Sequence, residues 1–278
     1  MNRSRYLPLD GRLAYVEDVG EGPAVLCIHT AGQSGVQWRY TIDALAALGY
    51  RVIVPDLPGH GRSEPAEDGL IDDLGRYGDW LLRLVNALEI DRLFVVGCSI
   101  GGKIALDLAT KSSARFHGVV AMAADSHNIG PSPRAVARTM EDSGSPSRAD
   151  RTYLGTLACV GRSVSEERRQ LIATMHRRED PYVTTSDLVG WARLDLRADL
   201  PDVTCPMHVV VGEDDFYLDV SSVERTADMI PGATFELLRG IGHYPMQDME
   251  GFPAVLHDWF SELAPQAIPA VAMQGSSA

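Results

Sequence analysis

The chain has few of the residues that mark metalloproteins and disulfide-bonded proteins. Its 278 residues include four cysteines, which lie far apart and form no C-x-x-C pair: Cys27, Cys98, Cys159 and Cys205. Such spacing indicates neither a zinc site nor a disulfide framework. The H-E-x-x-H, phosphate-loop and G-x-G-x-x-G patterns are also missing. We therefore expect a reducing compartment and no metal, nucleotide or flavin cofactor.

Long apolar runs are missing as well. No segment approaches the roughly 20 apolar residues that are needed to cross a bilayer. Residues Met1 to Tyr6 contain no apolar signal core. The sequence therefore predicts a cytoplasmic protein without membrane contact.

Positive charge is scarce relative to negative charge. Lys and Arg number 25 against 38 Asp and Glu, which gives a formal net charge of -13. A surface of this sign repels nucleic acid and anionic lipid. We therefore expect a small-molecule substrate and no nucleic-acid partner. The sequence does not decide whether the chain forms a homodimer.

The rest of the composition is that of an ordinary globular protein. Hydrophobic residues make up 45% of the chain and charged residues 23%, which argues against disorder. A chain of 278 residues can bury one large core, or a core with an insertion.

A strand-turn-helix pattern is centred on Ser99. The apolar run that ends at Val96 is followed by Gly97, and the pair Gly101-Gly102 opens a segment with helical spacing. Glycines two residues before and after Ser99 permit a strained turn that projects the hydroxyl from the sheet. The amides that follow are unpaired donors of a helix's first turn, and they favour the negative charge that forms when a nucleophile attacks a carbonyl.

Cys98 is the nearest alternative nucleophile to Ser99. The residues two positions before and after it are Val96 and Ile100, which are too large for such a turn. We therefore interpret Cys98 as a small side chain that packs beside the sheet.

Apolar strands alternate with helical segments along most of the chain. Asp10-Gly11 predicts a two-residue hairpin, and almost wholly apolar runs predict strands of a parallel sheet. Expected strands include residues 24–28, 51–54, 92–96, 118–123, 207–211 and 234–238; expected helices include 38–48, 71–88, 100–110, 220–229 and 253–263.

The pattern changes between residues 126 and 200. Pro, Gly, Ser and Arg interrupt this stretch, and no strand-like run appears before Met207. Helical segments are expected at residues 134–141, 148–160, 165–178 and 186–194. Five side chains of the stretch are candidates for a pocket wall, although core packing is the commoner role of such residues: Tyr153, Met175, His176, Tyr182 and Trp191.

Together these patterns resemble the α/β-hydrolase family, whose nucleophile lies in a G-x-S-x-G turn between a strand and a helix. The resemblance implies an α/β fold with a mostly parallel eight-stranded sheet, helices on both faces and an inserted helical cap. We place the core at residues 1–125 and 201–264, the cap at 126–200 and a flexible tail at 265–278. The loop from Asp56 to Ser63 is similar to a family loop whose role is mainly structural, so we interpret His60 as structural.

The resemblance also implies a catalytic triad in the chain order Ser, acid, His. Ser99 is the nucleophile, and His243, in a glycine-flanked loop after the last strand, is the base. The family's G-x-x-D pattern selects Asp215 as the acid. Asp125 is the alternative because some members of the family place their acid after the preceding strand; Asp214 is expected at the surface or in a turn.

The second half of the oxyanion hole falls in the loop that follows residues 24–28. By its resemblance to the family we assign the two donors to the backbone amides of Ala31 and Ile100. Thr30 stands where the family usually has glycine, which puts the loop conformation in question because Thr tolerates positive φ poorly. His29 is interpreted as a structural anchor.

The resemblance implies a serine hydrolase that cleaves a small carboxylic ester, a lactone or a carbon–carbon bond next to a ketone. Two alternatives keep the fold. One is a cofactor-free oxygenase or lyase in which His243 deprotonates the substrate and Ser99 binds it. The other is a small-molecule receptor with a vestigial triad.

Overall fold

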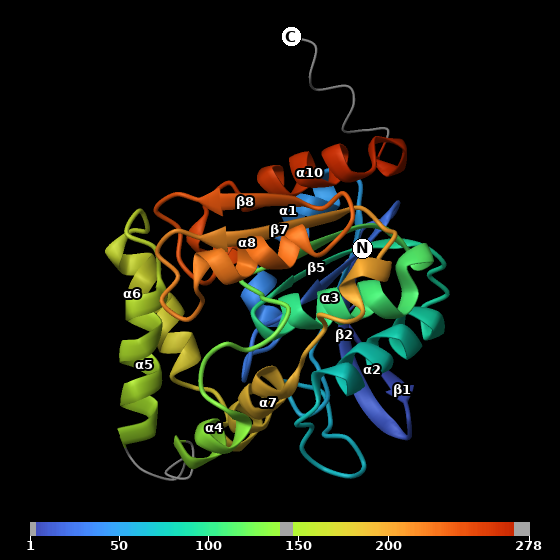
Figure 1. The fold of residues 1–278 in the computed structure, drawn as a ribbon. Helices are drawn as coiled ribbons and strands as arrows, with labels where there is room; N and C mark the ends of the chain where they lie inside the picture. Colours follow the sequence, from blue (N-terminus) through green and yellow to red (C-terminus); the bar gives the residue numbers. More distant parts are fainter. Residues whose placement is uncertain (1–3, 140–146, 270–278) are drawn as a thin grey trace.

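The computed structural model describes residues 4–139 and 147–269, where eight strands form one sheet between helical layers (Figure 1). The strand order is β1-β2-β4-β3-β5-β6-β7-β8. The strands are β1 (Arg5–Leu9), β2 (Arg12–Val19), β3 (Ala24–Ile28), β4 (Arg51–Pro55), β5 (Leu93–Cys98), β6 (Phe116–Met122), β7 (Met207–Gly212) and β8 (Thr234–Leu238).

The predicted hairpin at Asp10-Gly11 joins β1 to β2. Leu9 pairs with Arg12, so Asp10 and Gly11 alone form the turn, with φ angles of 52° and 73°. A two-residue turn of this kind requires positive φ at both positions, which Asp tolerates and Gly favours. The local sequence therefore specifies this turn correctly.

The strands from β3 onward are parallel, and β2 runs antiparallel to both of its neighbours. Every residue of β3, β5 and β7 is buried. Strands covered on both faces need apolar residues at every position, which explains why these runs do not alternate with polar ones. The predicted fold class is confirmed.

Helices cover both faces of the sheet (Figure 1). Helices α1 and α10 pack against each other on one face, and α2 and α3 pack against each other on the opposite face. The helices of the core are α1 (Ile42–Ala47), α2 (Leu74–Ala87), α3 (Ile100–Ser112), α8 (Val220–Asp228), α9 (Pro245–Asp248) and α10 (Phe252–Leu263). Short 3-10 turns are η1 (Gly35–Trp38), η2 (Ser113–Arg115), η3 (Leu200–Asp202) and η4 (Pro265–Ala267).

Helix boundaries differ from the predicted ones by a few residues. The carboxylate of Asp73 accepts a hydrogen bond from the amide of Gly75, so α2 begins after Asp73 rather than at residue 71. The helix predicted over 38–48 is shorter in the structure, because η1 ends at Trp38 and α1 covers only Ile42–Ala47. Helix α9 was not predicted, since four residues carry no periodic pattern.

In the described part of the chain, four α-helices lie between β6 and β7, and we call them the insertion. They are α4 (Pro133–Thr139), α5 (Ser147–Cys159), α6 (Glu166–His176) and α7 (Pro181–Arg193). Helix α4 packs against α7, and α5 packs against α6. The insertion lies at the side of the sheet toward which β7 and β8 point (Figure 1). The end of the helix predicted at 134–141 lies outside the described residues.

The start of the predicted flexible tail packs against the core. Residues 265–267 form η4, and the side chains of Ala267 and Ile268 pack against the core. Burial of these apolar groups holds the start of the predicted flexible tail, and residues 270–278 lie outside the described part. Among residues 4–139 and 147–269, no helix has the length and hydrophobicity to cross a membrane.

Candidate active site

Ser99 has a strained backbone at the junction of β5 and α3. Its φ and ψ angles are 59° and -119°, and it precedes the first residue of α3. Its amide donates to the carbonyl of Met122 at 2.9 Å, and its carbonyl accepts from the amide of Lys103 at 2.9 Å. These bonds hold a conformation that non-glycine residues rarely adopt.

The glycines on either side of Ser99 are required by close backbone contacts. A Cβ atom at Gly97 would lie 2.0 Å from the carbonyl oxygen of Gly101. A Cβ atom at Gly101 would lie 2.5 Å from the carbonyl oxygen of Ile28. Helix α3 therefore packs directly on the ends of β3 and β5, as the sequence pattern predicts.

His243 is paired with Asp215. Nδ1–H of His243 donates to Oδ2 of Asp215 at 2.7 Å, and the two side chains are 5% and 0% exposed. The other carboxylate oxygen of Asp215 accepts from the amides of Tyr217 and Leu218 at 2.8 and 3.2 Å. Since Nδ1 carries this proton, Nε2 of a neutral imidazole is free to accept one.

Ser99 and His243 both line a cavity of about 480 Å³. Within the described part of the chain no direct hydrogen bond joins their side chains. Such bonds are often long in ligand-free enzymes and shorten when substrate binds. The structure thus brings the hydroxyl, the imidazole and Asp215 to one site, with the imidazole bonded to the carboxylate.

Asp125, the alternative acid, and Asp214, which was expected at the surface or in a turn, have other partners. Asp125 forms an ion pair with Lys103 at 2.8 Å and accepts from the hydroxyl of Ser222 at 3.2 Å. Asp214 binds the guanidinium and backbone amide of Arg162, a residue between α5 and α6. Neither side chain contacts His243.

Cys98 is held away from the reactive position. Its thiol donates to the carbonyl of His243 at 3.1 Å, and its side chain is fully buried. Burial raises the pKa of the Cys98 thiol well above its ordinary value, because the thiolate would lose its hydration. This environment fits the packing role predicted for Cys98.

The two predicted oxyanion donors flank the site. Ile100 is the first residue of α3, so its amide has no partner within the helix. Ala31 lines the same cavity as Ser99. Thr30 is absent from the residues of the described chain that have positive φ, and Gly32 takes the positive φ of this loop instead, at 64°. The substitution of Thr for the usual glycine therefore imposes no backbone strain at position 30.

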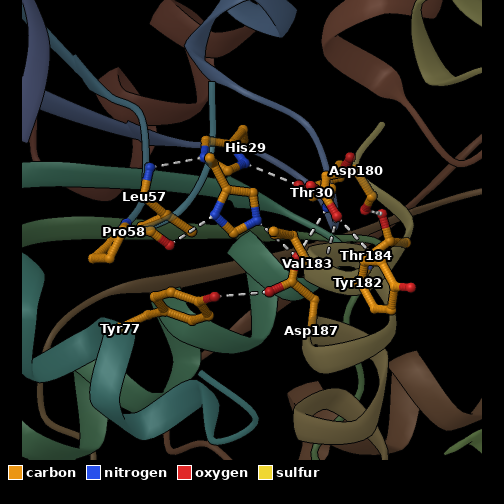
Figure 2. A network of polar contacts seen from close by, with 12 residues as sticks. His29, Thr30, Leu57, Pro58, Tyr77, Asp180, Tyr182, Val183, Thr184 and Asp187 are labelled. Carbon is orange, nitrogen blue, oxygen red and sulfur yellow. Dashed lines mark hydrogen bonds and ion pairs between the residues drawn. The ribbon is translucent and has the colours of Figure 1, made fainter. Parts of the chain in front are cut away.

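His29 is an anchor, as its sequence position suggests (Figure 2). Its Nδ1–H donates to the carbonyl of Thr30 at 2.9 Å, and its Nε2 accepts from the amide of Leu57 at 3.0 Å. Burial and the neighbouring His60 lower the pKa of His29 to about 4, so the ring is neutral at physiological pH. A neutral ring with both nitrogens occupied by backbone groups does not act as a base.

The loop between Asp56 and Ser63 is held by its own hydrogen bonds. Asp56 accepts from the amides of Gly35 and Arg62 and from the guanidinium of Arg62. The hydroxyl of Ser63 donates to the carbonyl of Asp56 at 2.6 Å. These bonds agree with a structural role for the loop.

The wall of the cavity opposite Ser99 comes from the insertion. Of the five predicted candidates, His176 and Trp191 line the cavity, whereas Tyr153, Met175 and Tyr182 do not. Sequence reasoning missed several lining residues because they lie on separate turns of α5 and α7 and in the connection between α6 and α7: Arg148, Thr152, Thr156, Glu179, Thr184 and Leu188.

Arg148 and Glu179 add charge to this wall. Their charged groups are 3.5 Å apart, and each side chain is 8% exposed. Burial raises the pKa of Glu179 to about 7, while hydrogen bonds from Thr152 and the charge of Arg148 oppose the rise. Among the described residues, no group of three His, Cys, Asp or Glu side chains is arranged to hold a metal ion.

Comparison with known proteins places the chain among hydrolases. A family model described as the alpha/beta hydrolase family matches residues 25–255. The chain is 26% identical over 239 residues to a pimeloyl-acyl-carrier-protein methyl ester esterase of Aeromonas hydrophila subsp. hydrophila. This match covers 83% of this chain and 92% of the relative.

Two further likenesses differ in extent. The chain is 35% identical over 146 residues to an epoxide hydrolase of Caballeronia sordidicola, but this match covers 52% of the chain and 43% of the relative. A thermophilic esterase from Thermogutta terrifontis has the same fold, with a TM-score of 0.81 and 23% identity over 94% of this chain and 99% of that chain.

Proposed function

We propose that this chain, a hydrolase that belongs to the alpha/beta hydrolase family, cleaves a small carboxylic ester or lactone through an acyl-enzyme on Ser99. One observation carries the proposal: Asp215 occupies Nδ1 of His243, while His243 and Ser99 line one cavity. An imidazole oriented in this way has its second nitrogen available for the hydroxyl proton.

The reaction follows from these positions. His243 accepts the proton of Ser99 as Oγ attacks the substrate carbonyl, and the amides of Ala31 and Ile100 stabilise the oxyanion. His243 then donates the proton to the leaving oxygen, which departs as an alcohol. Water, deprotonated by His243, attacks the acyl-enzyme; the carboxylic acid is released as His243 returns the proton to Oγ of Ser99. Asp215 stabilises the imidazolium in both steps.

The substrate class is supported by the cavity and by the relatives. About 480 Å³ suits a small molecule, and Leu188, Trp191 and Tyr244 supply apolar surface. The relative matched over most of its length is named a methyl ester esterase. Epoxide opening in the resembling family uses a nucleophilic Asp, so Ser99 argues against that activity despite the partial likeness to an epoxide hydrolase. Cleavage of a carbon–carbon bond next to a ketone uses the same three residues and belongs in the test.

The test is a panel of acyl esters, lactones and ring-fission diketones, assayed with the wild type and with Ser99→Ala. We expect hydrolysis by the wild type, a loss of at least about a thousandfold in kcat for Ser99→Ala, and a mass gain on Ser99 after treatment with a fluorophosphonate. Full activity in a folded Ser99→Ala variant would refute the proposal. Turnover that requires dioxygen would favour an oxygenase, and ligand-dependent protein binding without turnover a receptor.

A further inference from the structure

We propose that Asp187, on insertion helix α7, is a positioning residue that orients the Ala31 amide toward the nucleophile. The inference rests on the proposed function, because it concerns the oxyanion donor of that reaction. Residues 29–34, which we call the oxyanion loop, follow β3, whereas Asp187 lies more than 150 positions later in the chain.

Asp187 collects hydrogen bonds from three separate parts of the core (Figure 2). Its Oδ2 accepts from the amide of Gly32 at 2.9 Å and from Nε2–H of His60 at 2.8 Å. Its Oδ1 accepts from the hydroxyl of Tyr77, on α2, at 2.9 Å. The side chain has no exposed surface. Because a buried carboxylate needs its hydrogen-bond donors, these three bonds hold Asp187 and its donors in fixed relative positions.

The bond to Gly32 fixes the peptide group that follows Ala31. The amide of Gly32 belongs to the plane that joins Ala31 to Gly32, so its bond to Asp187 sets the orientation of that plane. Gly32 has a φ of 64°, a conformation that glycine adopts readily, so the bond to Asp187 is needed to hold the loop at this point.

The peptide group that contains the Ala31 amide is held through the histidines. In a trans peptide the N–H and the C=O point in opposite directions, so the carbonyl of Thr30 determines where the Ala31 N–H points. That carbonyl accepts from Nδ1–H of His29 at 2.9 Å and from the amide of Gln33 at 3.2 Å. The ring of His29 packs against the ring of His60, with centroids 4.8 Å apart. Asp187 therefore acts on both sides of Ala31.

The ring of His60 lies between Asp187 and the loop that follows β4. Nδ1 of His60 faces the carbonyl of Pro58 at 3.2 Å, and Nε2 faces Asp187, so both nitrogens are placed to donate. Burial opposes the charged ring, but the charge and hydrogen bond of Asp187 raise the pKa of His60 above its ordinary value. The contact between the insertion and the core is thus a buried hydrogen bond between an imidazole and a carboxylate.

Helix α7 also touches the oxyanion loop directly. A Cβ atom at Gly32 would lie 2.0 Å from Oγ1 of Thr184 and 3.0 Å from Oε2 of Glu179. The loop and the insertion therefore form one packed unit at this point. A change in the position of α7 would move the Gly32 amide, and with it the neighbouring donor of Ala31.

The experiment compares Asp187→Asn with Thr185→Val. The first variant keeps the size of the side chain but removes its charge. Thr185 lies two positions earlier on α7, and among the described residues its hydroxyl bonds only to the carbonyl of Pro181 in the same helix. For Asp187→Asn we expect kcat to fall about 10- to 100-fold with KM within about twofold, since removal of one oxyanion donor costs about 100- to 1,000-fold. Thr185→Val should retain both constants.

A second readout separates positioning from general damage. A trifluoromethyl alkyl ketone forms an oxyanion adduct with Ser99, whereas the corresponding secondary alcohol only occupies the cavity. Asp187→Asn should lower the affinity for the ketone by the same factor as kcat and leave the affinity for the alcohol unchanged. Equal loss for both ligands, or a kcat and ketone affinity equal to those of the wild type, would overturn the proposal.

A double variant guards against misfolding. Asp187→Asn leaves the buried ring of His60 without its carboxylate partner, whereas Asp187→Asn combined with His60→Gln removes both groups. The double variant should fold, judged by circular dichroism, and show the same selective loss of ketone affinity. Loss of the fold in both variants would assign Asp187 to stability and overturn the inference. If the wild type binds the ketone and Ser99→Ala binds it with the same affinity, the proposed function is instead refuted.

Discussion

The ammonium of Lys103 lies 2.8 Å from a carboxylate oxygen of Asp125, and the two side chains are 0% and 2% exposed. Lys103 is one helical turn after Ser99 on α3, and its ammonium also lies 5.1 Å from the ring centre of Trp191 in the insertion. Burial lowers the pKa of Lys103, while the charge of Asp125 opposes this change. Asp125 therefore serves the core beneath the active site, and Asp215 is the carboxylate on His243.

Asparagine variants of these two acids should fail in different ways. Asp125→Asn leaves the buried Lys103 without a counter-charge, so we expect a loss of about 3–5 kcal/mol in the free energy of unfolding and kcat within a few-fold of the wild type. Asp215→Asn removes the acceptor that orients His243, so kcat should fall by about 10⁴ with little change in stability. Urea unfolding and ester hydrolysis measure both. The reverse pattern would make Asp125 the catalytic acid.

The backbone strain at Ser99 should lower the free energy of unfolding. Ser99→Gly and Ser99→Ala both remove the hydroxyl. They differ because a φ of 59° costs most residues about 1–3 kcal/mol, whereas glycine adopts it without strain. We expect Ser99→Gly to be about 1 kcal/mol more stable than Ser99→Ala, since the flexibility of unfolded glycine offsets part of the relief. Thermal unfolding of the two inactive variants makes the comparison, and equal stability would contradict it.

Alanine at Gly101 should damage the fold. Its Cβ would lie 2.5 Å from the backbone carbonyl of Ile28, which cannot move without displacing β3, so we expect a loss of about 2 kcal/mol or more. Gly75, on α2, is the matched control: its nearest neighbours would be the side-chain ends of Asp73 and Lys111 at 3.2 and 3.4 Å. Gly75→Ala should keep or raise the stability measured in urea. Equal effects of both changes would disprove the close contact of α3 with β3.

The buried imidazole of His176 should make the protein sensitive to acid. Burial and the neighbouring His243 lower its pKa to about 3, and its Nε2 accepts from the side-chain amide of Gln37 at 3.3 Å. The unfolded chain binds a proton near pH 6.5 and the folded protein does not, so this stability is complete above pH 6.5 and is lost as the pH falls toward 3. The loss amounts to about 1.4 kcal/mol per pH unit.

The variant His176→Gln isolates this contribution, because Gln does not titrate and can still accept a hydrogen bond. Urea unfolding at pH 7.5 and pH 5.0 should show that the wild type loses about 2 kcal/mol more than the variant over this interval. The difference between the two proteins cancels the other titrating groups, including Glu179, whose raised pKa acts in the opposite direction. Parallel pH dependences would rule out a neutral buried His176.

Local features were predictable because neighbouring residues determine them. The turn at Asp10-Gly11 needs two residues that accept positive φ, and the turn at Ser99 needs glycines on both sides; both requirements are visible in the chain. The apolar strands were predictable because full burial on two faces demands apolar residues at every position. The order of elements, the sheet class and the place of the insertion follow from these patterns.

The choice between the two acids required the tertiary structure. Asp125 and Asp215 both follow buried strands, and only the folded chain shows which carboxylate contacts His243. The role of Asp187 had no local signal at all, since its three donors lie 110 to 155 positions away in the chain. Sequence alone determined the strands, turns and helices, because these depend on residues close together in the chain. Side-chain contacts across the site were decided by the packing of the insertion on the core, because hydrogen bonds between distant segments have no spacing rule to reveal them.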